Sequence, residues 1–492
     1  MMLLKDILYK VSLQAASGDM NISIENIHFD SGKVGKGDLF VAIKGTQVDG
    51  HDYIQTAIEK GASAIVSENE IAPVKNATIV RTESSSKALG IIASNYYGNP
   101  SSKLKLVGVT GTNGKTTTVF LLYNLFRKLG YNVGLLSTIL NKINEKEQPS
   151  THTTADALQI NQLLKRMVDS GCTHCFIEAS SHAIDQNRIA GLNIDIAVFT
   201  NISHDHLDYH LTFDAYIKAK KKLFDDLNPG SFALVNTDDK RGKIMLQNTR
   251  AEKRSFGIRS MSDYKAKIVS NSLQGLELDI DNIKIWFNLI GDFNAYNIMA
   301  AYGVSMILEE DREQVLVELS SISPVPGRFE RIPLKSNVIA IIDYAHTPDA
   351  LKNVLKTIDG VRTNNEQVIT VVGCGGNRDK EKRPIMAEIA CSLSNRVIFT
   401  SDNPRDEEPE VIIEDMKVGV RASDYKKTLT IVDRKEAIKT ALALSSDYDI
   451  ILIAGKGHEE YQEIKGVKRD FSDKKILLDL DKLMSNNKSD QD

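Results

Sequence analysis

The chain has few cysteines, prolines and tryptophans: four, 11 and one among 492 residues. Four cysteines in so long a chain exclude a disulfide-rich secreted scaffold and indicate a reducing compartment, so we expect a cytoplasmic protein. No apolar stretch approaches the roughly 18 residues that a membrane span needs. No apolar core typical of a signal peptide follows the first residues, and we expect no association with a membrane.

The chain also lacks a surplus of charge of one sign. Lys and Arg number 61 against 65 Asp and Glu, which gives a formal net charge of −4. This balance gives no indication of a nucleic-acid partner, so any anion site must be local.

The lone pair Cys172 and Cys175 has no second pair to complete a zinc site. We therefore expect both thiols to be buried in packing.

Two polar, turn-rich segments divide the chain into predicted domains. Asn99–Ser102 is the first junction and Pro324–Gly327 is the second. The length agrees with this division, because domains average about 150 residues. The predicted domains are residues 1–98, 99–326 and 327–492.

Apolar runs that alternate with helical patterns predict an α/β fold. Leu104–Val109 has the pattern of a buried strand, and the last domain has three short β-rich runs typical of central parallel strands. We expect a central domain built on a P-loop-type parallel sheet and a Rossmann-like C-terminal domain. The three C-terminal strands are predicted at Val368–Val372, Val397–Thr400 and Ile450–Ala454.

The strand at 104–109 leads into a glycine-rich loop and a helical pattern, which is the layout of a phosphate-binding loop. Glycines let backbone N–H groups approach anions, and the helix N-terminus adds partial positive charge. Lys115 can reach the terminal phosphates of a nucleotide, and Thr116 can hold Mg²⁺. The loop is a shorter variant, because Val109 stands where the general pattern has glycine. The predicted nucleotide-binding residues are Gly111, Thr112, Asn113, Gly114, Lys115, Thr116 and Thr117.

A second group of polar residues follows the predicted strand Ile194–Thr200. His204–His210 holds three His and two Asp, which alone could form a zinc hydrolase site. Beside a phosphate loop Mg²⁺ is favoured, and Mg²⁺ prefers oxygen ligands, so we expect only one His to bind it. Glu178, which ends another apolar run, is either a metal ligand or a helix N-cap. The lysines within 218–222 indicate, on residue type alone, the solvated face of a helix.

Three loops follow the three C-terminal strands, and in an open parallel sheet such loops gather at one edge. They offer Arg378 and Arg405 for carboxylates, with bidentate geometry. They offer Asp402 and Glu459 for ammonium groups. This mixture of charges favours a zwitterionic small molecule as ligand.

Together these motifs resemble those of the Mur ligase family, ATP-dependent amide-forming enzymes of peptidoglycan synthesis. The resemblance covers nearly the whole chain and implies a role in cell-wall biogenesis, cell shape and cell division. Besides the phosphate loop, it rests on Thr151–Thr154, Glu178–His182, Asn201–His210, Gly291–Asn297, Pro326–Arg328 and Asp343–Pro348.

The resemblance implies that residues 1–98 bind the UDP substrate, that residues 99–326 form the central ATPase domain and that residues 327–492 bind the amino acid. The uridine diphosphate end would contact Ser31, Thr46, Gln47 and Val48. The muramoyl-dipeptide would contact His152, Thr153, Thr154, Ser180, Gln186 and Arg188. Besides the loop, the nucleotide would contact Asn297, Arg328, Asp343 and His346. The amino acid would contact Arg378, Asp402, Asn403, Pro404, Arg405, Gly455 and Glu459.

The resemblance also implies the catalytic centre. Its catalytic residues would be Lys115, Glu178, His206 and Lys220, with Lys220 carbamylated. The Mg²⁺ ligands would be Thr116, Glu178, His206 and Lys220.

The implied reaction begins with transfer of the ATP γ-phosphoryl group to the D-Glu carboxylate of UDP-N-acetylmuramoyl-L-alanyl-D-glutamate. An amine of meso-diaminopimelate then attacks the acyl phosphate, since the Asp402–Arg405 loop looks like the diaminopimelate-adding version. ATP and Mg²⁺ are the implied cofactors, and the partners are small molecules that bind a monomer.

Four alternatives stay open on the sequence. The same ligation could use L-lysine, or the chain could be a ligase like folylpolyglutamate synthetase, which would lack a separate domain at 1–98. A zinc metallohydrolase would leave Lys115 unused. A non-enzymatic nucleotide switch would leave the charged C-terminal loops unexplained.

Overall fold

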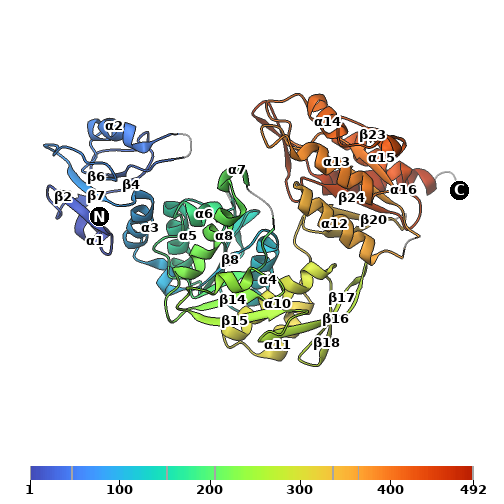
Figure 1. Ribbon diagram of the computed structural model, residues 1–492, viewed down its shortest axis with the longest axis horizontal. Helices are drawn as coiled ribbons and strands as arrows, with labels where there is room; N and C mark the ends of the chain where they lie inside the picture. The colour runs from blue at the N-terminus through green and yellow to red at the C-terminus, as the bar shows by residue number, and fades with distance from the viewer. Residues whose placement is uncertain are drawn as a thin grey trace. The chain divides into compact units, whose positions relative to one another are not determined.

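The computed structural model describes residues 2–45, 48–150, 153–203, 207–334, 337–363 and 365–489. They form two compact units, each described separately (Figure 1). The first unit contains the chain up to Ile202 together with His210–Lys265 and Asn297–Glu318. The second is built mainly of Ala266–Tyr296 and the chain from Leu319 onward.

The N-terminal part of the first unit is a small α/β layer. A five-stranded sheet has the order β2-β7-β6-β5-β4, in which β4 to β7 are parallel and β2 is antiparallel. Helices α1, α2 and α3 accompany this sheet, and β1 and β3 form a separate pair. The elements are β1 (Met2–Leu3), α1 (Leu4–Ile7), β2 (Leu13–Ser17), β3 (Ser23–Ile24), β4 (Ile27–His28), β5 (Leu39–Val41), α2 (Ile54–Glu59), β6 (Ala64–Ser67), β7 (Thr78–Thr82) and α3 (Ser85–Tyr96).

The rest of the first unit is built on a larger sheet with a parallel centre. Strands follow the order β11-β10-β9-β12-β8-β13-β14-β15. From β9 to the end of this order, each strand pairs in parallel with the next. The strands are β8 (Lys105–Thr110), β9 (Val133–Leu136), β10 (Leu140–Ile143), β11 (Lys146–Pro149), β12 (His174–Glu178), β13 (Ile196–Phe199), β14 (Phe232–Asn236) and β15 (Glu252–Gly257). The helices are α4 (Lys115–Lys128), α5 (Ala157–Asp169), α6 (Ser181–Asp185), α7 (Leu207–His210), α8 (Phe213–Asp225) and α9 (Gly242–Met245).

The chain order of these strands places a switch point beside β8. The chain passes from β8 to β9, returns to β12 next to β8, and then crosses to β13 on the other side of β8. At such a point the loops at the carboxyl ends of the strands diverge and leave a crevice for a ligand. The loop after β8 is the predicted phosphate loop, so the topology puts it where ligands bind.

The second unit contains a six-stranded sheet with the order β19-β20-β24-β21-β22-β23. All its neighbours pair in parallel except β19 and β20. The elements are β19 (Glu330–Pro333), β20 (Ile339–Asp343), α12 (Pro348–Val361), β21 (Val368–Val372), α13 (Lys382–Leu393), β22 (Arg396–Phe399), α14 (Pro409–Lys417), β23 (Thr428–Thr430), α15 (Arg434–Leu444), β24 (Ile450–Ala454) and α16 (Asp473–Ser489).

Shorter antiparallel elements complete this unit. Strands β17 and β18 pair with each other, and β17 also pairs with the second half of β16, whose first residues pair with β15. Strands β25 and β26 form a hairpin after β24. Their bounds are β16 (Tyr264–Ser272), β17 (Gly275–Ile280), β18 (Ile283–Phe287), β25 (Tyr461–Ile464) and β26 (Val467–Asp470). Helices α10 (Asp292–Ile307) and α11 (Arg312–Ser320) each contain residues of both units.

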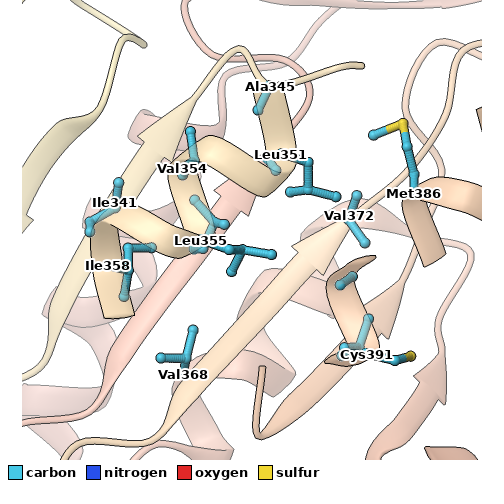
Figure 2. Close-up of a cluster of buried hydrophobic side chains, with 14 of the residues drawn as sticks. Ile341, Ala345, Leu351, Val354, Leu355, Ile358, Val368, Val372, Met386 and Cys391 are labelled. Carbon is cyan, nitrogen blue, oxygen red and sulfur yellow. The ribbon is translucent and has the colours of Figure 1, made fainter. Parts of the chain in front are cut away.

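Helix α12 shows why the sequence folds in this way locally. Thr347 caps its N-terminus by accepting from the N–H of Ala350, and Pro348 occupies the first turn, where no donor is needed. Apolar side chains then recur at helical spacing and pack onto β20 and β21, as Figure 2 shows. These buried residues are Leu351, Val354, Leu355 and Ile358.

The opposite face of the same sheet carries a second apolar cluster, which includes Ile438 of α15 and Leu477 of α16. A parallel sheet covered on both faces is the doubly wound arrangement, so the predicted α/β class and parallel central strands are confirmed. Cys172 and Cys175 are buried and free, as expected. Within the described residues, no helix is long and apolar enough to cross a membrane.

We predict that Leu355→Ala lowers the free energy of unfolding by about 2–5 kcal/mol, because it leaves a cavity between α12 and the sheet. Val411→Ala on α14 is the matched control, since Val411 is 52% exposed. Urea unfolding followed by circular dichroism measures both. Equal midpoints for the two variants would contradict the packing in Figure 2.

Candidate active site

The phosphate loop is bound tightly to the segment that follows β13. A Cβ at Gly111 would lie 1.9 Å from the hydroxyl oxygen of Thr200, so only glycine fits there. Asn201 accepts the N–H of Thr112 on its carbonyl (2.9 Å) and the N–H of Asn113 on its side-chain oxygen (3.0 Å). The loop conformation is therefore held by its neighbour in the sheet.

Helix α4 begins with features that fit an anion. Its N-cap is Gly114, which has φ +86° and offers no side chain to the first turn. The first N–H groups of a helix have no partner within the helix, and the helix dipole makes this end positive. A Cβ at Gly114 would lie 2.4 Å from the side-chain oxygen of Asn297, so the predicted nucleotide residue Asn297 lies directly against the loop.

Two lysine ammonium groups donate to the same carbonyl oxygen in this loop. Lys115 Nζ donates to Gly111 O (2.8 Å) and to Thr112 O (2.8 Å). Lys220 Nζ donates to Gly111 O as well (2.9 Å), and it lies 4.7 Å from the centre of the Tyr216 ring. The predicted catalytic residues Lys115 and Lys220 therefore meet at one atom.

The lysine run on α8 is not the solvated face expected from residue type. Lys220 and Lys221 are 1% and 8% exposed, and Lys221 pairs with Asp225. The expectation was wrong because α8 buries Lys220 and Lys221 together with Tyr216 and Phe224 of the same helix, which residue type alone does not reveal.

A fully buried carboxylate lies beside the loop. Glu178 accepts the hydroxyl of Thr116 (3.1 Å), the backbone N–H of Thr138 (2.7 Å) and the hydroxyl of Thr138 (3.2 Å). Ser180, and not Glu178, caps helix α6, so the N-cap alternative for Glu178 is wrong. The oxygens of Thr116 and Glu178 are hard donors of the kind that Mg²⁺ prefers, and in this respect the site fits that ion.

Four of the residues predicted for the muramoyl-dipeptide form one hydrogen-bonded network. Thr154 donates to the Glu178 carbonyl (2.7 Å) and to Ser180 Oγ (3.2 Å). Arg188 donates to the Thr154 carbonyl (2.8 Å) and, through Nε, to the side-chain oxygen of Gln186 (3.0 Å). The network joins this group to the strand that ends in Glu178.

Other predicted residues of the first unit are less connected. The carbonyl of Ser31 accepts from Lys60 (2.8 Å), and Val48 is 56% exposed. Thr153 is half-buried. Thr46, Gln47, His152 and His206 lie outside the described residues.

In the second unit, three predicted nucleotide residues lie near the start of β19 and the end of β20. Arg328 lies 4.7 Å above the ring of Tyr344, which in turn contacts the ring of His346. Asp343 accepts the N–H of Phe329 (2.6 Å). Burial raises the pKa of Asp343 to about 6, while the Arg328 guanidinium and this hydrogen bond oppose the rise.

The three C-terminal loops meet at one edge of the second unit's sheet. A Cβ at Gly375 would lie 2.9 Å from Arg405 Nη1 and 3.8 Å from Arg378 Cγ, so the two arginines converge around this glycine. A Cβ at Gly455 would lie 2.6 Å from a carboxylate oxygen of Asp402. Asn403, beside Pro404, donates to Glu459 (2.8 Å). All seven predicted amino-acid residues therefore belong to one cluster.

Several residues of both clusters escaped the sequence reasoning. Thr138 and Tyr216 support the phosphate site, and Lys456 and Glu463 support the amino-acid site. Asn201 belonged to a motif already singled out, and Lys456 stands in the third C-terminal loop between two predicted residues. Thr138 lies in a loop, Tyr216 on α8 and Glu463 on β25, and their contacts join segments far apart in the chain.

Models of one protein family match most of the chain. The Mur ligase family catalytic domain matches residues 23–97, the Mur ligase middle domain 109–305, and the Mur ligase glutamate ligase domain 327–457.

Full-length relatives agree with these models. The chain is 57% identical over 481 residues to a UDP-N-acetylmuramoyl-L-alanyl-D-glutamate–2,6-diaminopimelate ligase of Cytophaga hutchinsonii, which covers 97% of this chain and 99% of the relative. It is 51% identical over 480 residues to a protein of the same name from Bacteroides thetaiotaomicron, covering 97% and 100%.

Solved structures show the same architecture. A structure of UDP-N-acetylmuramoyl-L-alanyl-D-glutamate–2,6-diaminopimelate ligase has a TM-score of 0.70 and 33% identity, covering 98% of this chain and 99% of that one. The MurF ligase of Thermotoga maritima in complex with ADP has a TM-score of 0.60 at 21% identity, covering 96% and 100%, and shares the fold.

The doubly wound sheets, with a phosphate loop at the switch point of one and a charged loop cluster at the edge of the other, define a nucleotide-dependent enzyme. The chain belongs to the Mur ligase family, as its motifs indicated, and it is an ATP-dependent amide ligase. The metallohydrolase and nucleotide-switch alternatives are therefore wrong.

We predict that Asp343→Asn gains stability relative to the wild type as pH rises. A carboxyl whose pKa is raised in the folded state stabilises the fold at pH values below its pKa in the unfolded state, which is near 4. This contribution is lost as pH rises through the folded-state pKa of about 6. Between pH 4 and pH 7, the unfolding free energy of the variant should rise relative to that of the wild type by up to about 3 kcal/mol. Urea unfolding across this range measures it, with Asp447→Asn as an exposed control. A difference that stays constant with pH would contradict the burial of Asp343.

Proposed function

We propose that the chain joins meso-diaminopimelate to the D-Glu carboxylate of UDP-N-acetylmuramoyl-L-alanyl-D-glutamate, a step of peptidoglycan synthesis. Relatives that carry this activity in their names match 97% of the chain. The observation that carries the choice of amino acid is the pair of arginines around Gly375. Diaminopimelate differs from L-lysine by a second carboxylate at its distal end, and an arginine binds such a group through two parallel hydrogen bonds.

The side chain of Arg405 is prepared for this carboxylate. Nη1 donates to Gly376 O (2.9 Å), and Nε lies 3.5 Å from a carboxylate oxygen of Glu463. Among the described residues, none accepts from Nη2. The guanidinium is therefore held at one side and available at the other, which suits an incoming carboxylate.

The backbone of Arg405 is also constrained. Its φ is +52°, a region that costs a non-glycine residue on the order of 1 kcal/mol. Two hydrogen bonds hold it there, from the Arg405 N–H to the Glu463 carbonyl and from the Lys465 N–H to the Arg405 carbonyl. Such strain at a ligand-facing residue supports a functional role.

The roles of the remaining residues follow the same proposal. The α4 N-terminus, Lys115 and Thr116 would receive the phosphates of ATP, and Asn297, Arg328, Asp343 and His346 would border the rest of the nucleotide. Mg²⁺ would be held by Thr116, Glu178, His206 and Lys220, and it supplies positive charge to the phosphates. Ser31, Thr46, Gln47 and Val48 would contact the uridine diphosphate.

The chemistry requires an activated carboxylate, because a carboxylate is a poor electrophile. Phosphorylation of the D-Glu carboxylate gives an acyl phosphate, from which phosphate leaves when the amine attacks. Lys115 and Arg188 offset the repulsion between the substrate carboxylate and the triphosphate, and positioning supplies much of the rest. Arg188 would act from the network with Thr154, Ser180 and Gln186, beside His152 and Thr153. We propose that the enzyme acts as a monomer.

The shared Gly111 carbonyl supports carbamylation of Lys220. Two ammonium groups that donate to one oxygen repel each other, most strongly where water is excluded. Reaction of the amine with CO₂ forms an N–C bond and releases protons, which changes the charge of the side chain from positive to negative. The carbamate keeps one N–H, which can still donate to Gly111, and gains oxygens suited to Mg²⁺.

We predict that the wild-type enzyme prefers meso-diaminopimelate over L-lysine by roughly 10⁴-fold in kcat/KM, since a guanidinium left unpaired in its site penalises L-lysine. Arg405→Ala should lose most of this preference. The control is Arg421→Ala, an arginine of the same unit that is 67% exposed. Assays with ATP, the uridine-nucleotide dipeptide and each amino acid, with product analysis, measure the ratio. A preference for L-lysine would favour the lysine-adding alternative, and no ligation of either amino acid would reject the proposed function.

We also predict that Lys220→Ala is nearly inactive and is partly rescued by short carboxylic acids, whose oxygens can occupy the place of the carbamate. Lys218→Ala, an exposed lysine on the same helix, is the control and should keep full activity. Turnover with and without added acetate or formate tests this. Full activity of Lys220→Ala in CO₂-depleted buffer would show that the carbamate is not needed.

A further inference from the structure

Lys456 follows β24 in the loop between the two predicted amino-acid residues Gly455 and Glu459. Its side chain is fully buried, although a lysine almost never is unless it is paired. Its neighbours in the loop, Gly455 and Glu459, are the residues predicted to face the ligand.

The ammonium of Lys456 connects two residues of the amino-acid cluster. Nζ donates to Asn403 Oδ1 (3.0 Å) and to Glu459 Oε2 (3.1 Å). The ring of Tyr461 lies 5.5 Å from the same nitrogen. A buried ammonium without such partners would be strongly destabilising, so these contacts explain how it is accommodated.

These contacts determine which way the Asn403 amide points. Lys456 can only donate, and the N–H of Glu463 also donates to Asn403 Oδ1 (2.9 Å). The oxygen must therefore face these two donors, and the Asn403 amide nitrogen is directed to Glu459 Oε2 (2.8 Å). Reversal of the amide would place two N–H groups against two donors.

The same contacts leave one oxygen of Glu459 for a ligand. Oε2 accepts from both Lys456 and Asn403, whereas no described residue donates to Oε1. Glu459 is 15% exposed, so Oε1 belongs to a carboxylate that is held in place and still reaches the surface. A fixed carboxylate oxygen is a suitable acceptor for an ammonium group.

We propose that Lys456 is a positioning residue for the amino-acid substrate: it locks Asn403 and Glu459 so that Glu459 Oε1 accepts an ammonium group of the diamino acid. This inference rests on the proposed function of the same site. It differs from a purely structural role, because it couples Lys456 to the affinity for the amino acid and not to the affinity for ATP.

The test compares Lys456→Met, which keeps the length and apolar stem, with Lys456→Arg, which keeps the charge and the donors. The control is Lys439→Met, a lysine of an exposed Lys–Glu pair on α15 in the same unit. KM and kcat are measured for the amino acid that the wild type ligates, and KM is measured for ATP. Lys456→Gln, which keeps a donor without the charge, replaces Lys456→Met if the latter does not fold.

For Lys456→Met we expect the KM of the amino acid to rise at least tenfold while the KM of ATP stays within twofold. Lys456→Arg should recover part of this loss, and Lys439→Met should match the wild type. An amino-acid KM within twofold of the wild type, or a parallel rise of both KM values, would overturn the positioning role. A wild type that ligates neither amino acid would reject the proposed function itself, and with it this inference.

Discussion

The close contact between Gly111 and Thr200 is the constraint on which the rest of the phosphate site depends. Because no Cβ separates the loop from the next strand, the Gly111 carbonyl comes within reach of Lys115 and Lys220. Asn201 then holds the following N–H groups, so α4 starts at a fixed place beside β12. Thr116, in the first turn of α4, thereby meets Glu178 at the end of β12. A single glycine thus sets the positions of two cations, a hydroxyl and a buried carboxylate.

The two clusters handle buried charge differently. In the amino-acid cluster, the buried ammonium of Lys456 has a carboxylate partner in Glu459, and Arg405 has one in Glu463. These pairs resist loss of either member, since a lone buried charge costs several kcal/mol. In the phosphate cluster, Lys220 shares a carbonyl acceptor with a second cation. The shared acceptor supports the proposed carbamylation of Lys220, whereas the carboxylate partner of Lys456 favours retention of its positive charge.

The sequence predicted the fold and the two clusters because both depend on local patterns. Strands such as Val368–Val372 and Ile450–Ala454 match their predicted bounds, since buried parallel strands are continuous apolar runs. Loops after such strands gather at one sheet edge, and this rule predicts that Arg405 and Glu459 lie close together. The burial of Lys220 could not be predicted in this way, because its ammonium donates to Gly111, which lies far from it in the chain. Thr138 and Lys456 were missed for the same reason.

Specificity in this architecture follows from hydrogen-bond direction more than from charge alone. The amino-acid cluster contains acceptors and donors in near balance, so net charge would not distinguish one zwitterion from another. Lys456 orients the Asn403 amide. Both residues donate to one carboxylate oxygen of Glu459, and its other oxygen stays available. Gly376 and Glu463 in turn hold one side of the Arg405 guanidinium. In the proposed function, this fixed acceptor and this fixed donor fork would select a ligand by the spacing of its ammonium and carboxylate groups. A diamino acid with a carboxylate at its distal end carries that pair of groups on its distal carbon as well as on its α-carbon, whereas L-lysine carries it on the α-carbon alone.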